Sequence, residues 1–318
     1  MPANRIAFGI SLAVVLTLPL QATGPVESGR AEIRHSLEIR QLPSTSFRHA
    51  IEQSASLPLE SFQIQGALIR GGSPRAIMFA LMEAAGSITR KGVVTSATGS
   101  SQLPIRGVRR TLTAYDIALP REAWRAWFRS LAFARFNRAR LIFDSGPGLP
   151  DDPIRLTTEL AEEYGIDLTI EPASPVQPSL RDTLRISPAI RAIRATAADA
   201  GLTAEIVKSA GRYVVVETDP GVAIPADVPS RVLAPWESGA PRPCGPGCDF
   251  VWIIPGAVQP SPALLDSGAA GFEIDHLQLE VWSGFGYAIK QGVAPARKST
   301  VRRKSTSPSK KTTTKRKR

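Results

Sequence analysis

The sequence predicts an α+β protein built from two small modules of the βαββαββ type in tandem, followed by a β-rich segment and a disordered tail. Alternating apolar residues, as over residues 35–40, predict short strands. Two alanine-rich segments begin with Ser-Pro at Ser73 and Ser187, where serine caps a helix and proline suits its first position. The glycines that follow them, Gly86 and Gly201, are common helix ends. Because both segments stand in the same order among predicted strands, we expect an internal repeat, with two unrelated alanine-rich helices as the alternative.

The first module is predicted to cover residues 31–100. Its expected elements are a strand at 35–40, a helix at 45–56, extended chain at 62–68, a helix from Ser73 to Gly86, and closing strands near Ile88 and Val93. Gly99 marks the loop that ends the module.

A connecting unit, residues 101–150, is expected to be extended over 107–119, helical over 120–136 and extended again over 140–143. The helix carries an apolar stripe that is more typical of a buried core than of a ligand platform: Trp124, Trp127, Phe128 and Leu131. Arginines around the stripe could contact phosphate, but the polar face of an amphipathic helix is their ordinary interpretation: Arg121, Arg125, Arg129, Arg135, Arg138 and Arg140.

The second module is predicted to cover residues 151–219. Its expected elements are a helix at 156–164, a strand at 166–170, extended chain at 180–186, a helix at 187–200 and a hairpin over 203–216. Residues 220–294 form a segment rich in proline and glycine. Its strands, expected at 250–254 and 272–282, indicate added β-structure rather than a catalytic domain.

The only two cysteines, Cys244 and Cys248, lie in the sequence Pro-Cys-Gly-Pro-Gly-Cys. Such a loop turns sharply enough for a small disulfide ring, which an oxidising compartment would permit. A structural zinc site needs four ligands, and the only histidine in this half of the chain is His276. The pattern therefore favours a disulfide over a metal or redox role.

The net charge of +11 belongs entirely to the C-terminal end. From Arg297 onward the chain has eleven basic and no acidic residues, so the rest of the protein balances 28 basic against 28 acidic residues. Residues 295–318 are too poor in apolar side chains to fold and are predicted to be a disordered tail. The tail could bind an anionic polymer or a membrane surface, or only keep the protein soluble, and it lacks the aromatic residues that specific nucleic-acid recognition needs. The candidate polyanion-binding residues are Arg302, Arg303, Lys304, Lys310, Lys311, Lys315, Arg316, Lys317 and Arg318.

The N-terminus predicts a secretory signal peptide over residues 1–22. Arg5 supplies the positive charge, residues 6–20 form the apolar stretch, and Ala22 suits a cleavage site. The apolar stretch is shorter than the roughly 20 residues that span a bilayer as a helix. We therefore expect a periplasmic or otherwise exported protein, with membrane anchoring through an uncleaved signal as the alternative.

Parts of the second module resemble the short N-terminal domain of secretins and TonB-dependent receptors: residues 160–170, 180–190, 200–206 and 213–216. That family shows a helix ending in glycine, a strand, a strand leading into a Ser- or Thr-started helix, a Gly-Leu step and a hairpin. The first module resembles it more loosely, and no pore or receptor barrel follows. The resemblance implies a non-catalytic interaction module that binds a secretin-like or TonB-linked envelope partner, as an accessory to a secretion, pilus or uptake system.

The sequence contains no nucleophile elbow, zinc-protease motif or phosphate-binding glycine loop. Its histidines are isolated, and its adjacent acidic pairs point apart in a regular structure: Asp151-Asp152 and Glu162-Glu163. We therefore predict no catalytic, cofactor-binding or metal-binding residues and no cofactor. Two alternatives stay open: an envelope-anchoring or polyanion-binding protein that acts through its tail, and a small hydrolase whose site is assembled only in space.

Overall fold

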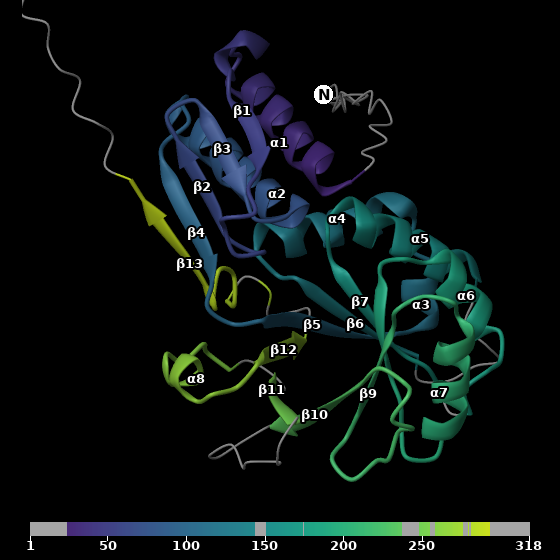
Figure 1. The fold of residues 1–318 in the computed structure, drawn as a ribbon. Helices are drawn as coiled ribbons and strands as arrows, with labels where there is room; N and C mark the ends of the chain where they lie inside the picture. The colour runs from purple at the N-terminus through teal and green to yellow at the C-terminus, as the bar shows by residue number, and fades with distance from the viewer. Residues whose placement is uncertain are drawn as a thin grey trace, which may run out of the picture.

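The computed structural model describes residues 24–143, 151–173, 175–236, 248–254, 258–275, 279 and 281–292. These residues form a small sheet covered by two helices and, beside it, a closed barrel (Figure 1). The predicted signal peptide and the predicted tail lie outside the described residues, so both stay predictions. Among the helices of the described ranges, none combines the length and apolar character that crossing a membrane requires.

The small sheet has five strands in the order β1-β3-β2-β4-β13. They are β1 (Ala50–Gln53), β2 (Phe62–Gln65), β3 (Leu68–Gly71), β4 (Ala97–Ser101) and β13 (Tyr287–Gln291). The last strand comes from the far end of the chain and pairs antiparallel with β4, which ties the two ends of the fold together. The helices α1 (Pro25–Ile39) and α2 (Pro74–Lys91) pack against each other, and α2 also contacts β1, β2 and β3; the short 3₁₀ helix η1 (Ser44–Ser46) follows α1.

The helix α2 begins as predicted and ends later than predicted. The Ser73 hydroxyl accepts a hydrogen bond from the Ala76 N–H, and Pro74 occupies the first turn. Gly86 lies inside the helix, which continues until Gly92 takes a left-handed conformation at φ 73°. The long apolar face of α2 is buried against the sheet, so packing outweighs the weak helix propensity of one glycine.

The barrel consists of eight parallel strands that close on themselves in the order β10-β11-β12-β5-β6-β7-β8-β9. They are β5 (Ile105–Leu112), β6 (Arg138–Phe143), β7 (Asp167–Glu171), β8 (Ile190–Arg194), β9 (Val215–Thr218), β10 (Ser230–Trp236), β11 (Cys248–Ile254) and β12 (Gly271–Asp275). The pairing of β12 with β5 closes the barrel, with Gly271 opposite Ile105 and Asp275 opposite Arg109.

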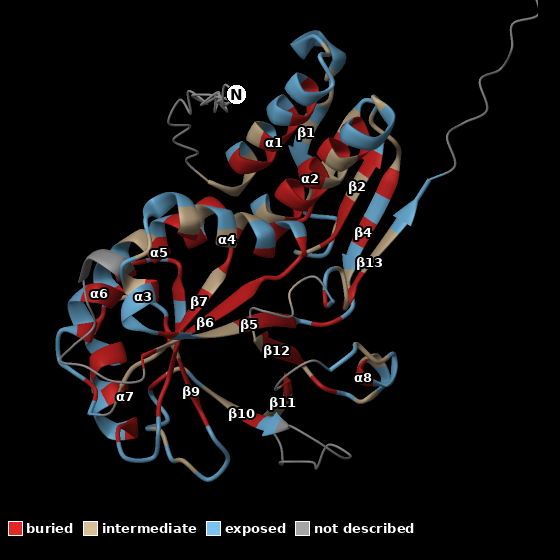
Figure 2. Cartoon of the chain, turned by 180° about the vertical axis from the view of Figure 1, so that it is seen from behind, coloured by how far each residue is buried: buried red, intermediate tan, exposed pale blue. Residues whose placement is uncertain are grey.

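Helices connect most of these strands. They are α3 (Ala114–Ile117), α4 (Arg121–Phe133), α5 (Asp151–Glu163), α6 (Leu180–Ile186), α7 (Ala200–Ser209) and α8 (Ala263–Asp266). The helices α3 to α7 lie outside the barrel on the side of β5 to β8 (Figure 1). The apolar stripe on α4 is a core feature as expected, because Trp124, Phe128 and Leu131 are buried. Figure 2 shows buried residues along the barrel strands and on the helix faces turned towards them.

The predicted fold class is wrong, and the two halves of the predicted repeat have different structures. Residues 35–39 belong to the helix α1 rather than to a strand. Ser187-Pro188 does not begin a helix but precedes the barrel strand β8, and the expected strand at 203–207 lies within the helix α7. The second predicted module is therefore part of a parallel barrel. Short apolar runs do not by themselves distinguish a buried strand from a buried helix, and the repeat rested on such runs.

Candidate functional site in the barrel interior

The inward-facing side of the barrel is charged over much of its circumference. Successive residues of a strand point to opposite faces, so Ala139 and Leu141 of β6 pack outwards under the helices while Arg138 and Arg140 point inwards. The same alternation on β12 turns Glu273 inwards, beside Phe272 and Ile274 in the outer core. Near β10 and β11 the interior is instead apolar and contains a separate small cluster: Ile105, Leu233, Val251 and Ile253.

Arg138 lies at the centre of a buried ion network. Its Nη1 donates to Glu217 Oε1 at 2.6 Å, and its Nε lies 2.8 Å from Glu273 Oε1. Arg140 donates to the other oxygen of Glu273, and Arg231 donates to Glu217 at 3.0 Å. The two glutamates are almost completely buried, with side chains 2% and 1% exposed. Such charges are tolerated in a protein interior only when they are paired and hydrogen-bonded, as they are here.

Two members of the network, Glu217 and Arg138, have shifted pKa values. Burial alone would raise the pKa of Glu217, but the facing Arg138 outweighs burial and holds that pKa below its ordinary value of 4.5. Burial likewise opposes the charge of Arg138, and the two glutamates more than compensate, so the pKa of Arg138 is raised. Both groups therefore stay ionised at neutral pH.

Two carboxyl groups show the opposite shift. Burial raises the pKa of Glu162 and of Glu163 above the ordinary value. Both residues lie on α5, on the outside of the barrel, where Glu163 faces Arg125. They are consequently not part of the interior site.

At the carboxyl ends of six neighbouring strands, basic and acidic side chains lie side by side around the barrel. We call this set the carboxyl-end ring: Arg109, Arg140, Glu171, Arg194, Asp219 and Asp275. Arg109 Nε lies 3.2 Å from Asp275 Oδ1, Arg140 Nη1 lies 3.4 Å from Glu171 Oε2, and Arg194 pairs with Asp219. The three carboxylates are partly exposed, with side chains 31% exposed at Glu171, 53% at Asp219 and 43% at Asp275. They are accessible to a ligand, unlike Glu217 and Glu273.

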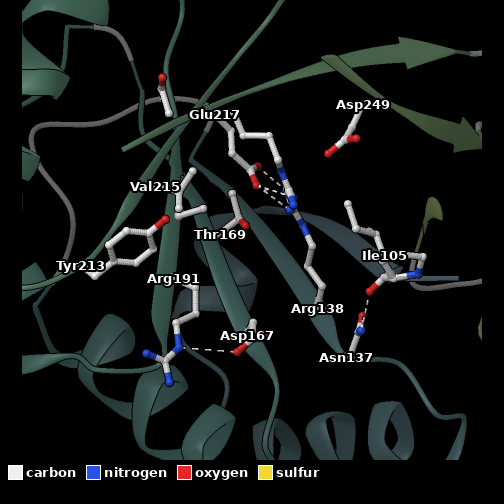
Figure 3. Close-up of a pocket in the computed structure, with 14 residues that line it drawn as sticks. Ile105, Asn137, Arg138, Asp167, Thr169, Arg191, Tyr213, Val215, Glu217 and Asp249 are labelled. Atoms are coloured by element: carbon white, nitrogen blue, oxygen red, sulfur yellow. Dashed lines mark hydrogen bonds and ion pairs between the residues drawn. The ribbon is translucent and has the colours of Figure 1, made fainter. Parts of the chain in front are cut away.

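A pocket of about 500 Å³ lies at the opposite mouth of the barrel, where the strands begin (Figure 3). We call it the amino-end pocket. It is lined by charged and polar residues from seven strand beginnings, including Asn137, Asp167, Arg191, Tyr213, Arg231 and Asp249. The buried pair Arg138–Glu217 forms its floor towards the barrel centre. The ion network thus extends from this pocket to the carboxyl-end ring.

The cysteines and the tail residues that the sequence predicted as sites do not belong to the described interior site. Cys248 is the first residue of β11, whereas Cys244 is outside the described residues, so their disulfide stays a prediction. All nine candidate polyanion-binding residues of the tail are outside the described residues as well. The assignment of the arginines to an amphipathic helix surface is wrong for three of them, because Arg135, Arg138 and Arg140 are buried and the last two lie on β6.

The interior site was missed although the sequence contains a signal for it. Charged or polar residues recur at every second position in Arg138-Ala-Arg140, in Asp167-Leu-Thr-Ile-Glu171 and in Glu273-Ile-Asp275. Alternation of this kind predicts a strand with one apolar and one polar face, and the polar face is ordinarily assigned to solvent. In a closed barrel that face is enclosed, and closure cannot be read from any single strand. The described residues contain no group of three or more His, Cys, Asp or Glu side chains placed to hold a metal ion.

No protein-family model and no curated protein matches this sequence. Solved structures do match. A GH138 enzyme that targets pectin rhamnogalacturonan II aligns with a TM-score of 0.58 at 12% identity, over 82% of this chain and 49% of its own. A glycoside hydrolase family 20 β-N-acetylglucosaminidase aligns with a TM-score of 0.53 at 10% identity, over 81% of this chain and 84% of its own. The chain therefore spans about half the length of the first enzyme and most of the second.

The fold is that of a TIM barrel. At identities this low the similarity establishes the fold and nothing finer. It nevertheless contradicts the expected relationship to the short domain of secretins and TonB-dependent receptors, because the matches extend over about four-fifths of the chain and include the closed barrel. The expectation of a non-catalytic accessory module for secretion or uptake rested on that relationship and is wrong for the same reason. The expected envelope partner and the exported location stay predictions.

Proposed function

We propose that this protein is a glycoside hydrolase that acts at the carboxyl-end ring of its barrel. One observation carries the proposal: the three partly exposed carboxylates of the barrel interior, Glu171, Asp219 and Asp275, gather at the end where TIM-barrel enzymes place their catalytic groups. Two glycoside hydrolases are among the solved structures that share the fold, which supports this class of reaction.

Glycoside hydrolysis ordinarily requires two carboxyl groups on either side of the scissile bond. One donates a proton to the leaving oxygen, and the other attacks the sugar or activates water. The ring supplies acidic groups from three different strand ends, β7, β9 and β12, so that a sugar bound across the mouth would lie between carboxylates of opposite walls. The neighbouring arginines Arg109, Arg140 and Arg194 would donate hydrogen bonds to sugar hydroxyls.

The substrate class that we propose is a glycan. The two similar enzymes act on different sugars by their names, one on a pectin and one on β-N-acetylglucosaminides, so the sugar itself has to be identified by experiment. The arginines and carboxylates of the ring supply both donors and acceptors, which suits a polyhydroxylated ligand.

The proposal is tested with a panel of chromogenic aryl glycosides that includes N-acetylhexosaminides and uronides. The unmodified protein should release the aryl group from at least one member. Asp275→Asn and Glu171→Gln should each reduce kcat at least 100-fold, as expected for loss of a catalytic acid or base. The matched control is Asp227→Asn, which removes an exposed carboxylate outside the barrel, paired with Lys208, and should leave kcat unchanged. Absence of turnover with every glycoside would refute hydrolysis.

A second candidate function is glycan binding without hydrolysis. It is favoured by the presence of donors beside acceptors in the ring, because this arrangement can bind sugar hydroxyls without any proton transfer. The same panel separates the two functions. Binding of a glycan at the ring, abolished by Asp275→Asn and never accompanied by turnover, would establish the second.

A further inference from the structure

The amino-end pocket is a built cavity with side chains fixed in place from several directions. Asp167 receives a hydrogen bond of 3.0 Å from Arg75, which reaches over from α2 of the sheet unit. The Asn137 side chain is held by the Arg106 backbone N–H and by the oxygens of Glu60 and Pro104. Polar groups that are fixed before a ligand arrives lose little freedom when it binds, which favours affinity.

Several lining groups are nevertheless left available. Among the described residues, Arg191 has a single ion pair, at 3.6 Å to Asp167, and its side chain is 62% exposed. Asp249 lines the pocket across from it and has no ion pair within the described part of the chain. Arg231 uses one guanidinium nitrogen on Glu217 and is 34% exposed. The pocket therefore offers further donors on Arg191 and Arg231 and an acceptor on Asp249.

Tyr213 adds an aromatic surface to the same cavity. It lies beside Val215 at the start of β9, on the side of the pocket that also carries Arg191, and it is 72% exposed (Figure 3). An exposed aromatic ring at the rim of a polar cavity is suited to a ligand that has both an apolar face and polar edges. A pyranose ring has this character, because its C–H groups can pack on the tyrosine while its hydroxyls form hydrogen bonds.

The charges of the lining select against simple ions. An inorganic anion would be attracted to the two arginines but repelled by the acidic residues of the lining, Asp167, Asp249 and Glu217. A simple cation would be attracted to these acidic residues but repelled by Arg191 and Arg231. A sugar hydroxyl both donates and accepts, so one uncharged ligand can accept from Arg191 and donate to Asp249. The volume of about 500 Å³ falls in the range of small-molecule sites.

We propose that the amino-end pocket is a saccharide-binding site, separate from the carboxyl-end ring and at the opposite mouth of the barrel. Tyr213 packs against the sugar ring, and Arg191, Arg231 and Asp249 hydrogen-bond its hydroxyls. The site does not depend on hydrolysis at the ring, since its lining residues come from the beginnings of the strands.

The experiment is a titration of the full-length Asp275→Asn variant, in which the ring is altered, with glucose, galactose, N-acetylglucosamine and their disaccharides, followed by calorimetry or by ligand-observed NMR. We expect one of these sugars to bind. Tyr213→Ala and Asp249→Asn, each added to Asp275→Asn, should weaken binding at least tenfold, because each removes a principal contact. Tyr115→Ala is the matched control, since Tyr115 is 74% exposed and lies on α3, and it should leave the affinity unchanged.

Three outcomes would overturn the proposal. They are no saccharide binding up to millimolar concentration, binding that neither Tyr213→Ala nor Asp249→Asn weakens, and preference for inorganic phosphate or for a zwitterionic amino acid such as glycine over every sugar. Thermal unfolding of each variant shows that it is folded. If no saccharide binds at the amino-end pocket but the unmodified protein hydrolyses a glycoside, the proposed hydrolysis stands and the saccharide site is refuted. If a saccharide binds there but no glycoside is hydrolysed, the saccharide site stands and the hydrolysis is refuted.

Discussion

The substitution Arg138→Met removes the guanidinium that joins Glu217 to Glu273 inside the barrel while keeping most of the side-chain volume. The two glutamates are 2% and 1% exposed, so neither can recover hydration when its partner disappears. Removing one member of a buried ion pair costs about 3–5 kcal/mol. Because Arg231 and Arg140 still contact one glutamate each, we expect the unfolding free energy to fall by the lower end of this range, about 3 kcal/mol.

The assay is equilibrium unfolding in urea. With a slope of about 3 kcal/mol per molar urea for a chain of this size, the midpoint should fall by about 1 M. The matched control is Arg181→Met, since Arg181 is 51% exposed and its ion pair with Asp182 is at the surface. Its loss should change the unfolding free energy by less than about 1 kcal/mol.

A double-mutant cycle with Glu217→Gln makes the test specific to the pair. Residues in contact within one ion network are coupled by about 0.5–3 kcal/mol, so the double variant should lose less stability than the two single variants together. A loss below about 1 kcal/mol for Arg138→Met, or strict additivity in the cycle, would refute the reasoning that these charges are buried and mutually compensated.

Two further predictions concern barrel closure and pH. Gly271 has φ 157°, and a Cβ there would lie 1.8 Å from the Ile105 carbonyl oxygen, so Gly271→Ala should disrupt the β12–β5 seam and reduce the yield of folded protein, measured by circular dichroism. Gly201→Ala is the control: a Cβ at this position of α7 would lie in open space, so the substitution should stabilise the folded protein by about 0.5 kcal/mol. If Gly271→Ala and Gly201→Ala gave the same yield of folded protein, the close contact at the β12–β5 seam would not matter for folding. Because the pKa of Glu217 is lowered in the folded state, its stabilising contribution is complete above about pH 4.5 and is lost as the pH falls through the folded value. Between about pH 5 and pH 3, the urea midpoint should therefore fall less steeply with decreasing pH for Glu217→Gln than for the unmodified protein. The same pH dependence in both proteins would contradict a lowered pKa of Glu217.

Individual elements were predicted better than their assembly. The cap at Ser73, the helix α4 with its buried Trp124 and the strand β7 all follow from local patterns, because capping, amphipathicity and alternation act within a few residues. The segment at 203–207 was assigned the wrong state because Thr, Ile and Val favour strands in isolation, whereas here they face the barrel from a helix. Barrel closure depends on pairing between β12 and β5, which are separated by more than 150 residues.

The candidate site was not predicted at all, for the related reason that it exists only after closure. Glu217 and Arg138 are 79 positions apart, and Arg140 and Glu273 are 133 apart. Each is an ordinary charged residue in its own segment. Only the alternation of polar or charged residues with apolar ones within β6, β7 and β12 indicated that several strands have a polar face, and one sequence cannot show that these faces meet.

Burying charged side chains inside the barrel costs desolvation free energy, and this cost is informative about function. The barrel can evidently be filled with apolar side chains, since Leu233, Val251 and Ile253 fill the part near β10 and β11. TIM barrels generally use branched apolar residues in this position. Replacing a buried ion network by apolar residues is often neutral or stabilising, so stability does not account for the presence of Arg138, Glu217 and Glu273. A network that apolar residues could replace without loss of stability, and that connects the carboxyl-end ring with the amino-end pocket, is best explained by what it holds in place at those two mouths.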